Sequence, residues 1–154
     1  MEDKIGIKGC VTVEVYRAKT GKREVICRDK TNLLTSAGRD WIHGQLYSTG
    51  TTDEAIYIAV SSNTGGVSSS HTSLASEIST SGLQRAAGTP SHTAGTPTTT
   101  VTKTFIAAGA FTAIQLTGLF TASSSGTLVH ENTFTPVNLG TDDQLTVTWT
   151  ITAA

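Results

Sequence analysis

The sequence predicts an all-β, mainly antiparallel protein: a small β-sandwich or flattened barrel of about seven strands with one short helix and an N-terminal arm. Charged residues make up only 15% of the 154 residues, and threonine, serine and glycine take their place. Threonine suits strands because its β-branched side chain fits a half-buried pleated surface. Several segments also alternate apolar and polar residues with a period of two, which places the apolar side chains on one strand face.

The N-terminal part is predicted to be an arm followed by a hairpin. Residues 1–9 are expected to form the arm, and residues 10–154 a single β-domain that begins with a hairpin over residues 10–28. In the first strand of the hairpin Val11, Val13 and Val15 share one face. A turn around Gly21, where a positive φ is easily adopted, connects it to a second strand at residues 24–28.

A helix is predicted over residues 36–47. Thr35 or Ser36 is placed to accept a hydrogen bond from an amide at the start of the helix, and Trp41, Ile42 and Leu46 fall broadly on one helical face. An apolar face on a single short helix indicates that the helix plugs one open end of the sheet. Trp41 is expected in the core for this reason, and Trp149 because it lies in the last alternating strand.

Strands are predicted from residue 55 onward. Residues 55–60 are almost continuously apolar, which is typical of a central strand covered on both faces. The polar residues 61–70 indicate a loop, and the low-complexity residues 88–97 a mobile surface loop. Four closing strands are expected at residues 98–106, 111–120, 127–134 and 144–151. In the last of them Leu145, Val147, Trp149 and Ile151 lie on one face, and three threonines lie on the other.

Charge and hydropathy argue against nucleic-acid and membrane partners. The net charge is −1 and the pI about 6.4, so a basic face for phosphate is not indicated. No apolar run approaches the roughly 18 residues that span a bilayer. The charged N-terminus lacks a secretory h-region, so we expect synthesis in a cytoplasm. Cys10 and Cys27 are then expected as free thiols, with a bridge between neighbouring strands as the alternative.

Residues that could carry chemistry do not form a recognisable catalytic or metal-binding pattern. None of the four histidines has a second His or Cys at ligand spacing, and the abundant serines include no Gly-x-Ser-x-Gly elbow. The adjacent Asp142 and Asp143 are interpreted as a solvated turn rather than a calcium site. We therefore expect no enzyme activity, no catalytic residue, no metal and no cofactor. The histidines are His43, His71, His92 and His130.

An ordered set of segments spans nearly the whole chain, with gaps at the loops around residues 61–73 and 87–100. They are residues 11–16, 18–21, 32–41, 57–60, 118–122, 126–128, 133–137 and 143–151. Together these segments resemble a widespread family of short tailed-bacteriophage virion proteins, among them the capsid decoration (cement) proteins of some long-tailed phages. The chain departs from the family pattern at Thr117, where relatives often carry an acidic residue before Gly-Leu-Phe.

The resemblance implies a virion protein on the capsid exterior that binds the major capsid protein as a homotrimer, with the arm reaching a neighbour. Low charge and exposed strand edges independently favour an oligomer. The alternative is a structural or receptor-binding protein of the tail tip or tail fibre that recognises host-surface glycans through residues 61–73 and 87–97. Those loops hold no Trp or Tyr for stacking on sugars. The candidate assembly contacts are Lys4, Ile5, Ile7, Lys8, Trp41 and Tyr47.

Overall fold

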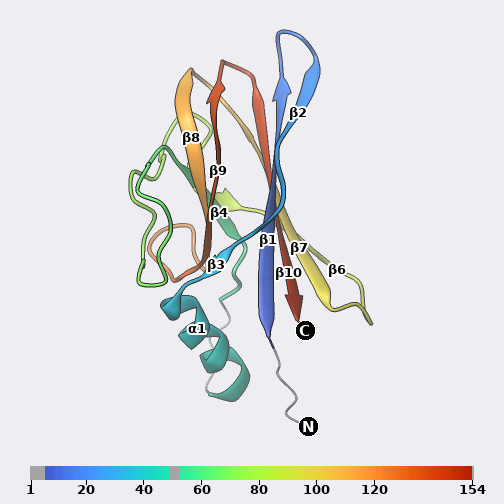
Figure 1. Ribbon diagram of the computed structural model, residues 1–154, viewed down its shortest axis with the longest axis vertical. Coiled ribbons are helices and arrows are strands. Elements are labelled where there is room, and N and C mark those ends of the chain that lie inside the picture. Colours follow the sequence, from blue (N-terminus) through green and yellow to red (C-terminus); the bar gives the residue numbers. More distant parts are fainter. Residues whose placement is uncertain (1–5, 49–52, 154) are drawn as a thin grey trace.

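The structure, a computed structural model that describes residues 6–48 and 53–153, is mainly antiparallel β with a single helix in that part of the chain (Figure 1). Two five-stranded sheets face each other. Sheet A has the order β2-β1-β10-β7-β6, and sheet B the order β3-β9-β8-β4-β5. The bounds are β1 (Ile7–Arg17), β2 (Lys22–Thr31), β3 (Leu33–Leu34), α1 (Ser36–Tyr47), β4 (Tyr57–Ser61), β5 (Ala86–Ala87), β6 (Thr89–His92), β7 (Thr98–Ile106), β8 (Phe111–Phe120), β9 (Leu128–Leu139) and β10 (Gln144–Ala153).

The core lies between the two sheets and draws on both. Strands β1, β10 and β7 of sheet A and β4, β8 and β9 of sheet B contribute buried side chains to one cluster. Trp149, which is fully buried, is the largest of them, as its alternating strand predicts. This two-layered arrangement is compatible with the expected sandwich. The inward residues include Val11, Val13, Val15, Leu145, Val147, Val101, Phe105, Ile58, Val60, Ile114, Leu119, Phe134 and Val137.

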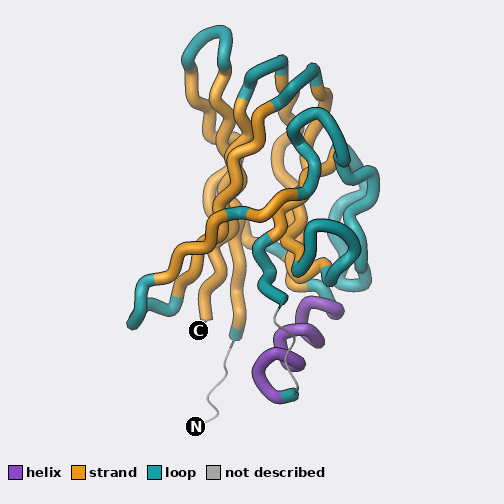
Figure 2. Tube along the Cα trace, turned by 180° about the vertical axis from the view of Figure 1, so that it is seen from behind, coloured by secondary structure: helices purple, strands orange, loops and turns teal. Residues whose placement is uncertain are grey.

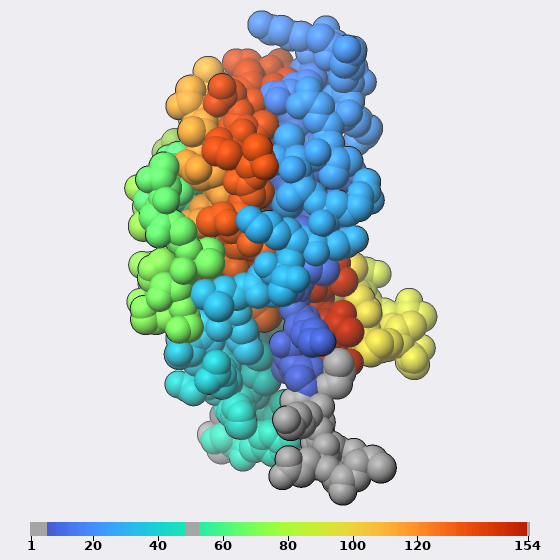
Figure 3. All heavy atoms as spheres, in the orientation of Figure 1, coloured from blue at the N-terminus to red at the C-terminus, as the bar shows by residue number. Residues whose placement is uncertain are grey.

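The predicted hairpin is confirmed as β1 and β2, which extend further than expected. The turn closes through the Gly21 amide, which donates to the Arg17 carbonyl at 2.8 Å, and Gly21 has a φ of +68°. The hairpin tip projects beyond the rest of the molecule (Figure 3). At its other end β1 begins at Ile7, which pairs with Ala153 of β10, so residues 7–9 of the expected arm belong to a strand.

The predicted helix is confirmed at residues 36–47. Thr35 is its N-cap, and the Thr35 side chain accepts a hydrogen bond from the Gly38 amide at 2.9 Å. Gly38 lies directly against the backbone of Val129 in β9, with no room for a Cβ. Figure 2 shows that the helix lies at one end of the two sheets, the end where β1 begins and β10 finishes.

Ten strands occupy the described ranges, rather than the seven expected, and the additional ones are β3, β5 and β6. The low-complexity residues 88–97, expected to be a loop only, contribute the edge strand β6, which pairs with β7. Strand β9 also runs beyond its predicted end at residue 134. Pro136 lies within it, in the irregular stretch between the pairs Leu116–Thr133 and Ile114–Val137, where a ladder hydrogen bond is not required.

The two cysteines are free and face opposite sides of sheet A. Cys10 is in register with Thr150 on the outer face, whereas Cys27 packs against the core. Burial raises the pKa of both thiols, which keeps them in the less reactive protonated form.

Candidate functional site

An exposed apolar patch lies at the helix end of the molecule. Ile7 of β1 and Ile42, His43, Leu46 and Tyr47 of α1 line one shallow depression, which we call the helix-end patch. Leu46 is 64% exposed and Tyr47 76% exposed, the two highest values among the exposed large hydrophobic residues of the described chain. The His43 and Tyr47 rings lie 6.0 Å apart. Exposed apolar groups gathered in this way are typical of a surface that another molecule covers.

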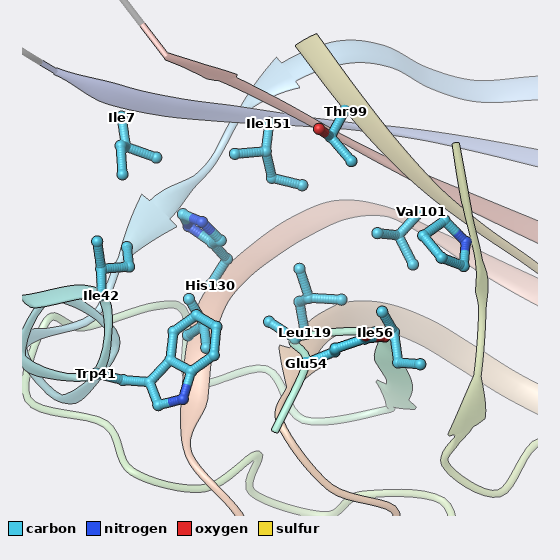
Figure 4. Close-up of a pocket in the computed structure, with 13 residues that line it drawn as sticks. Ile7, Trp41, Ile42, Glu54, Ile56, Thr99, Val101, Leu119, His130 and Ile151 are labelled. Atoms are coloured by element: carbon cyan, nitrogen blue, oxygen red, sulfur yellow. The ribbon is translucent and has the colours of Figure 1, made fainter. Parts of the chain in front are cut away.

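A cavity of about 370 Å³ opens beside this patch, between the two sheets, and we call it the end cavity (Figure 4). The helix therefore does not fill the end of the sheets, and Trp41, expected in the core, is only partly buried along one side of the cavity. Side chains from the helix and from both sheets line it, and most of them are apolar, the polar ones being Glu54, Thr99 and His130. The apolar ones include Trp41, Ile42, Ile56, Val101, Leu119 and Ile151.

His130 of β9 is the most deeply buried polar side chain in the wall of the end cavity. Its side chain lies among Ile7, Ile42 and Ile151 (Figure 4), it is 2% exposed, and its ring stacks on Trp149 at 6.1 Å. Burial lowers the pKa of His130 to about 4, although a hydrogen bond to the backbone of Leu33 acts in the opposite direction. The imidazole is therefore neutral at pH 7. Its Nδ1 atom has no hydrogen-bond partner among the described residues.

The outer face of sheet A carries the threonine surface that the alternation predicts. Threonines of β7 and β10 lie opposite one another in four pairs, at every second position of the register. In two of these pairs the hydroxyl oxygens are within hydrogen-bond distance, at 3.2 Å and 2.8 Å. Cross-strand pairs of this kind stabilise the sheet. The pairs are Thr98–Thr152, Thr100–Thr150, Thr102–Thr148 and Thr104–Thr146.

The outer face of sheet B is covered by the segment between β4 and β5, which buries a second apolar cluster. Glu131 of β9 is fully buried beneath this segment and binds it at two points. Its carboxylate accepts a hydrogen bond from the Ser68 amide at 2.6 Å and lies 2.9 Å from Nδ1 of His71. The covering segment is therefore attached to the sheet through a buried carboxylate that the sequence did not single out.

Arg85 attaches the far end of the same segment. Its guanidinium forms two hydrogen bonds with the Glu77 carboxylate and donates to the Ser125 carbonyl at 2.7 Å. It also lies 3.4 Å from the centre of the Phe120 ring. Only six charged residues follow Ser61 in the sequence. Three of them, Glu77, Arg85 and Glu131, hold the covering segment in place through these contacts.

Asp143, interpreted as part of a solvated turn, is instead 6% exposed at the end opposite the helix. Burial opposes its ionisation, but hydrogen bonds from the Gly140 and Ala18 amides and from Arg17 hold the pKa of the carboxyl below its ordinary value. Arg17 also pairs with Glu24 at 2.9 Å. This cluster connects the β1–β2 hairpin to the turn before β10.

The structure brings only some of the candidate assembly contacts together. Ile7 and Tyr47 share the helix-end patch, and Trp41 lies beside it in the end cavity. Lys8 is exposed and in register with Thr152 of β10, on the threonine side. Lys4 and Ile5 lie outside the described residues. The sequence did not indicate His130 or the cavity, because neither shows a pattern along the chain.

The described residues were searched for a metal site and for a membrane-spanning helix. These residues contain no group of three or more His, Cys, Asp or Glu side chains placed to hold a metal ion. Within the same ranges, the helix is too short and too polar to cross a membrane. A comparison of the chain with protein-family models, with curated proteins and with solved structures finds no significant match.

Proposed function

We propose that this protein is a non-enzymatic structural protein of a tailed-bacteriophage particle: a capsid decoration protein that binds the outside of the assembled shell as a homotrimer. Its partner is then the major capsid protein. The ordered segments that resemble virion proteins suggest the class. The helix-end patch supports the mode of action, because Leu46 and Tyr47 are largely exposed there beside the partly buried Ile7.

The physical basis of the proposed function is mass action. A protein that binds only the assembled shell stabilises that state by an amount that grows with its free concentration relative to Kd. A trimer offers three copies of each contact, so that individually weak contacts at the patch and at the N-terminal arm add up to high avidity. The threonine face and the unpaired edges of β2 and β6 are surfaces that copies cover for one another.

Copy number in the particle tests the assignment directly. Quantitative mass spectrometry of purified virions that carry this chain should find hundreds of copies per particle. A handful of copies would favour the tail, where the glycan-binding alternative places the protein. Absence from purified particles would contradict both virion assignments.

The role of the helix-end patch is tested with a matched pair of variants. Leu46→Ser combined with Tyr47→Ser should weaken binding to shells that lack the protein at least about tenfold, because apolar and aromatic anchors carry much of the energy of an interface. Ile106→Ser is the control, since Ile106 is 55% exposed at the opposite end of β7. Both variants should keep wild-type stability within about 0.5 kcal/mol. Equal shell binding by the two variants would exclude the patch as the docking surface.

A further inference from the structure

The outer face of sheet A is a broad surface whose middle rows carry no charged side chain. Residues directly opposite one another in an antiparallel sheet point to the same face, so the registers define rows of side chains across β1, β10, β7 and β6. One middle row consists of threonines only, and the next adds a cysteine and a serine. These rows are Thr12–Thr148–Thr102–Thr89 and Cys10–Thr150–Thr100–Ser91. All of these side chains are at least partly exposed, whereas the outer face of sheet B is covered by the segment between β4 and β5.

Several hydroxyl groups of this face already have hydrogen-bond partners within the chain. In two cross-strand threonine pairs the hydroxyl oxygens lie 3.2 Å and 2.8 Å apart. The Thr12 hydroxyl accepts a hydrogen bond from the Asp29 amide at 3.0 Å and donates to the Asp29 carboxylate at 3.3 Å. Removing such groups from water costs less than removing unpaired ones, and the threonine methyl groups gain from burial. Another protein surface can therefore cover this face at low cost.

The size of the face suits an interface between two protein molecules. Sheet A has five strands, and its rows run from Lys8 to Tyr16 along β1. With strands about 4.8 Å apart and a rise of about 3.3 Å per residue, the flat footprint is about 600 Å². The accessible area is larger than the footprint because side chains add relief, so it approaches the roughly 800 Å² that each partner buries in a standard interface.

The charges that β1, β10, β7 and β6 place on this face are complementary to those of a second copy. They are Lys8 and Glu14, both exposed on β1, about 20 Å apart on either side of the uncharged rows. Neither belongs to an ion pair among the described residues. A two-fold axis that runs across the strands lays β1 of one copy antiparallel over β1 of the other, so that each Lys8 meets the other copy's Glu14. An axis along the strands would instead place like charges at the same level.

We propose that the outer face of sheet A pairs two copies of this chain, face to face and antiparallel, with Lys8 of each copy against Glu14 of the other. The threonine rows form the centre of this interface and the charges lie toward its rim, which is the usual distribution in protein interfaces. The contact is two-fold, so it is distinct from the three-fold contacts of the proposed trimer and joins copies of different trimers. It does not depend on the virion assignment.

Charge reversal tests the pairing in sedimentation equilibrium of the purified chain over a concentration series. Lys8→Glu and Glu14→Lys should each weaken the pairing at least about tenfold, because each places like charges together at both ends of the interface. The double variant restores opposite charges and should pair about as tightly as the wild type. Lys22→Glu is the control, since Lys22 is exposed opposite Arg17 at the hairpin turn and the substitution changes the net charge equally. All of these positions are exposed, so the substitutions cost little stability.

Rescue by the double variant is a result that a purely structural role of Lys8 or Glu14 would not produce. Three results would overturn the proposal: a wild type without two-fold pairs at any concentration, single variants that pair as tightly as the wild type, or a double variant as weak as the single ones. A trimer whose further association ignores these substitutions would also overturn it, while leaving the proposed trimer intact. Copy number in virions tests the decoration role separately.

Discussion

Acidification should remove much of the stability that depends on keeping His130 buried and neutral. The pKa of His130 is about 4 in the folded protein and about 6.5 in the unfolded chain. Above pH 6.5 neither state binds the proton, and the stabilisation is fully present. Between pH 6.5 and 4 the unfolded chain takes up a proton that the folded protein excludes, so the free energy of unfolding falls as the pH falls. The loss by pH 4 is about 3 kcal/mol.

Urea denaturation at pH 7.0 and pH 4.5, followed by tryptophan fluorescence, measures this loss. The wild type should lose about 2–3 kcal/mol through His130, together with a contribution from Asp143, whose lowered pKa acts in the same direction. His130→Phe should lose only the remainder, so the difference between the two proteins isolates the histidine. Parallel losses in the two proteins would refute the burial of a neutral imidazole.

Three further substitutions test how the helix and the covering segment are held. Gly38→Ala should lower the free energy of unfolding by about 1–2 kcal/mol, because a clash with Val129 outweighs the gain of up to about 1 kcal/mol in helix propensity. In Gly44→Ala the added Cβ meets nothing within 4 Å, so the free energy of unfolding should instead rise by up to about 1 kcal/mol. If thermal melts showed both substitutions shifting the stability in the same direction, the contact between Gly38 and Val129 would be contradicted. Arg85→Ala should cost about 2 kcal/mol and increase amide exchange in the segment between β4 and β5, since Glu77 loses its partner. Unchanged exchange there would show that Arg85 does not anchor the segment.

The longer strands could be predicted from the sequence whether one face is buried, as in β7, or both faces are, as in β4. Residues 98–106 and 111–120 match β7 and β8 in both bounds, because apolar patterning and flanking turn residues are local signals. The helix could be predicted equally well, because Thr35 caps it and its apolar residues have helical spacing. These elements are determined by residues close together in the chain.

The short strands could not be predicted because their stability comes from partners far away in sequence. Strand β6, Thr89–His92, has no buried residue and no alternation, and its pairing with β7 holds it as an edge strand. Strands β3 and β5 have two residues each and follow from the position of β9 and β4. A single-sequence pattern contains no information on such pairing.

Only the surface part of the candidate site was predicted from the sequence. Ile7 and Tyr47 could be chosen because they are apolar residues near the arm and at the end of the helix. Trp41, in contrast, was expected in the core, and it lines the end cavity instead. His130 and Glu131 are adjacent in β9, yet one lines the end cavity and the other holds the segment outside sheet B. Their different environments arise from tertiary packing, which a lone histidine or glutamate in a sequence does not reveal.

The location of the protein on the particle tests the central claim most directly. Negative-stain imaging of virions labelled with an antibody against this chain should show label distributed over the whole capsid surface and none on the tail. Label confined to the tail tip, or particles that carry none, would contradict a decoration role.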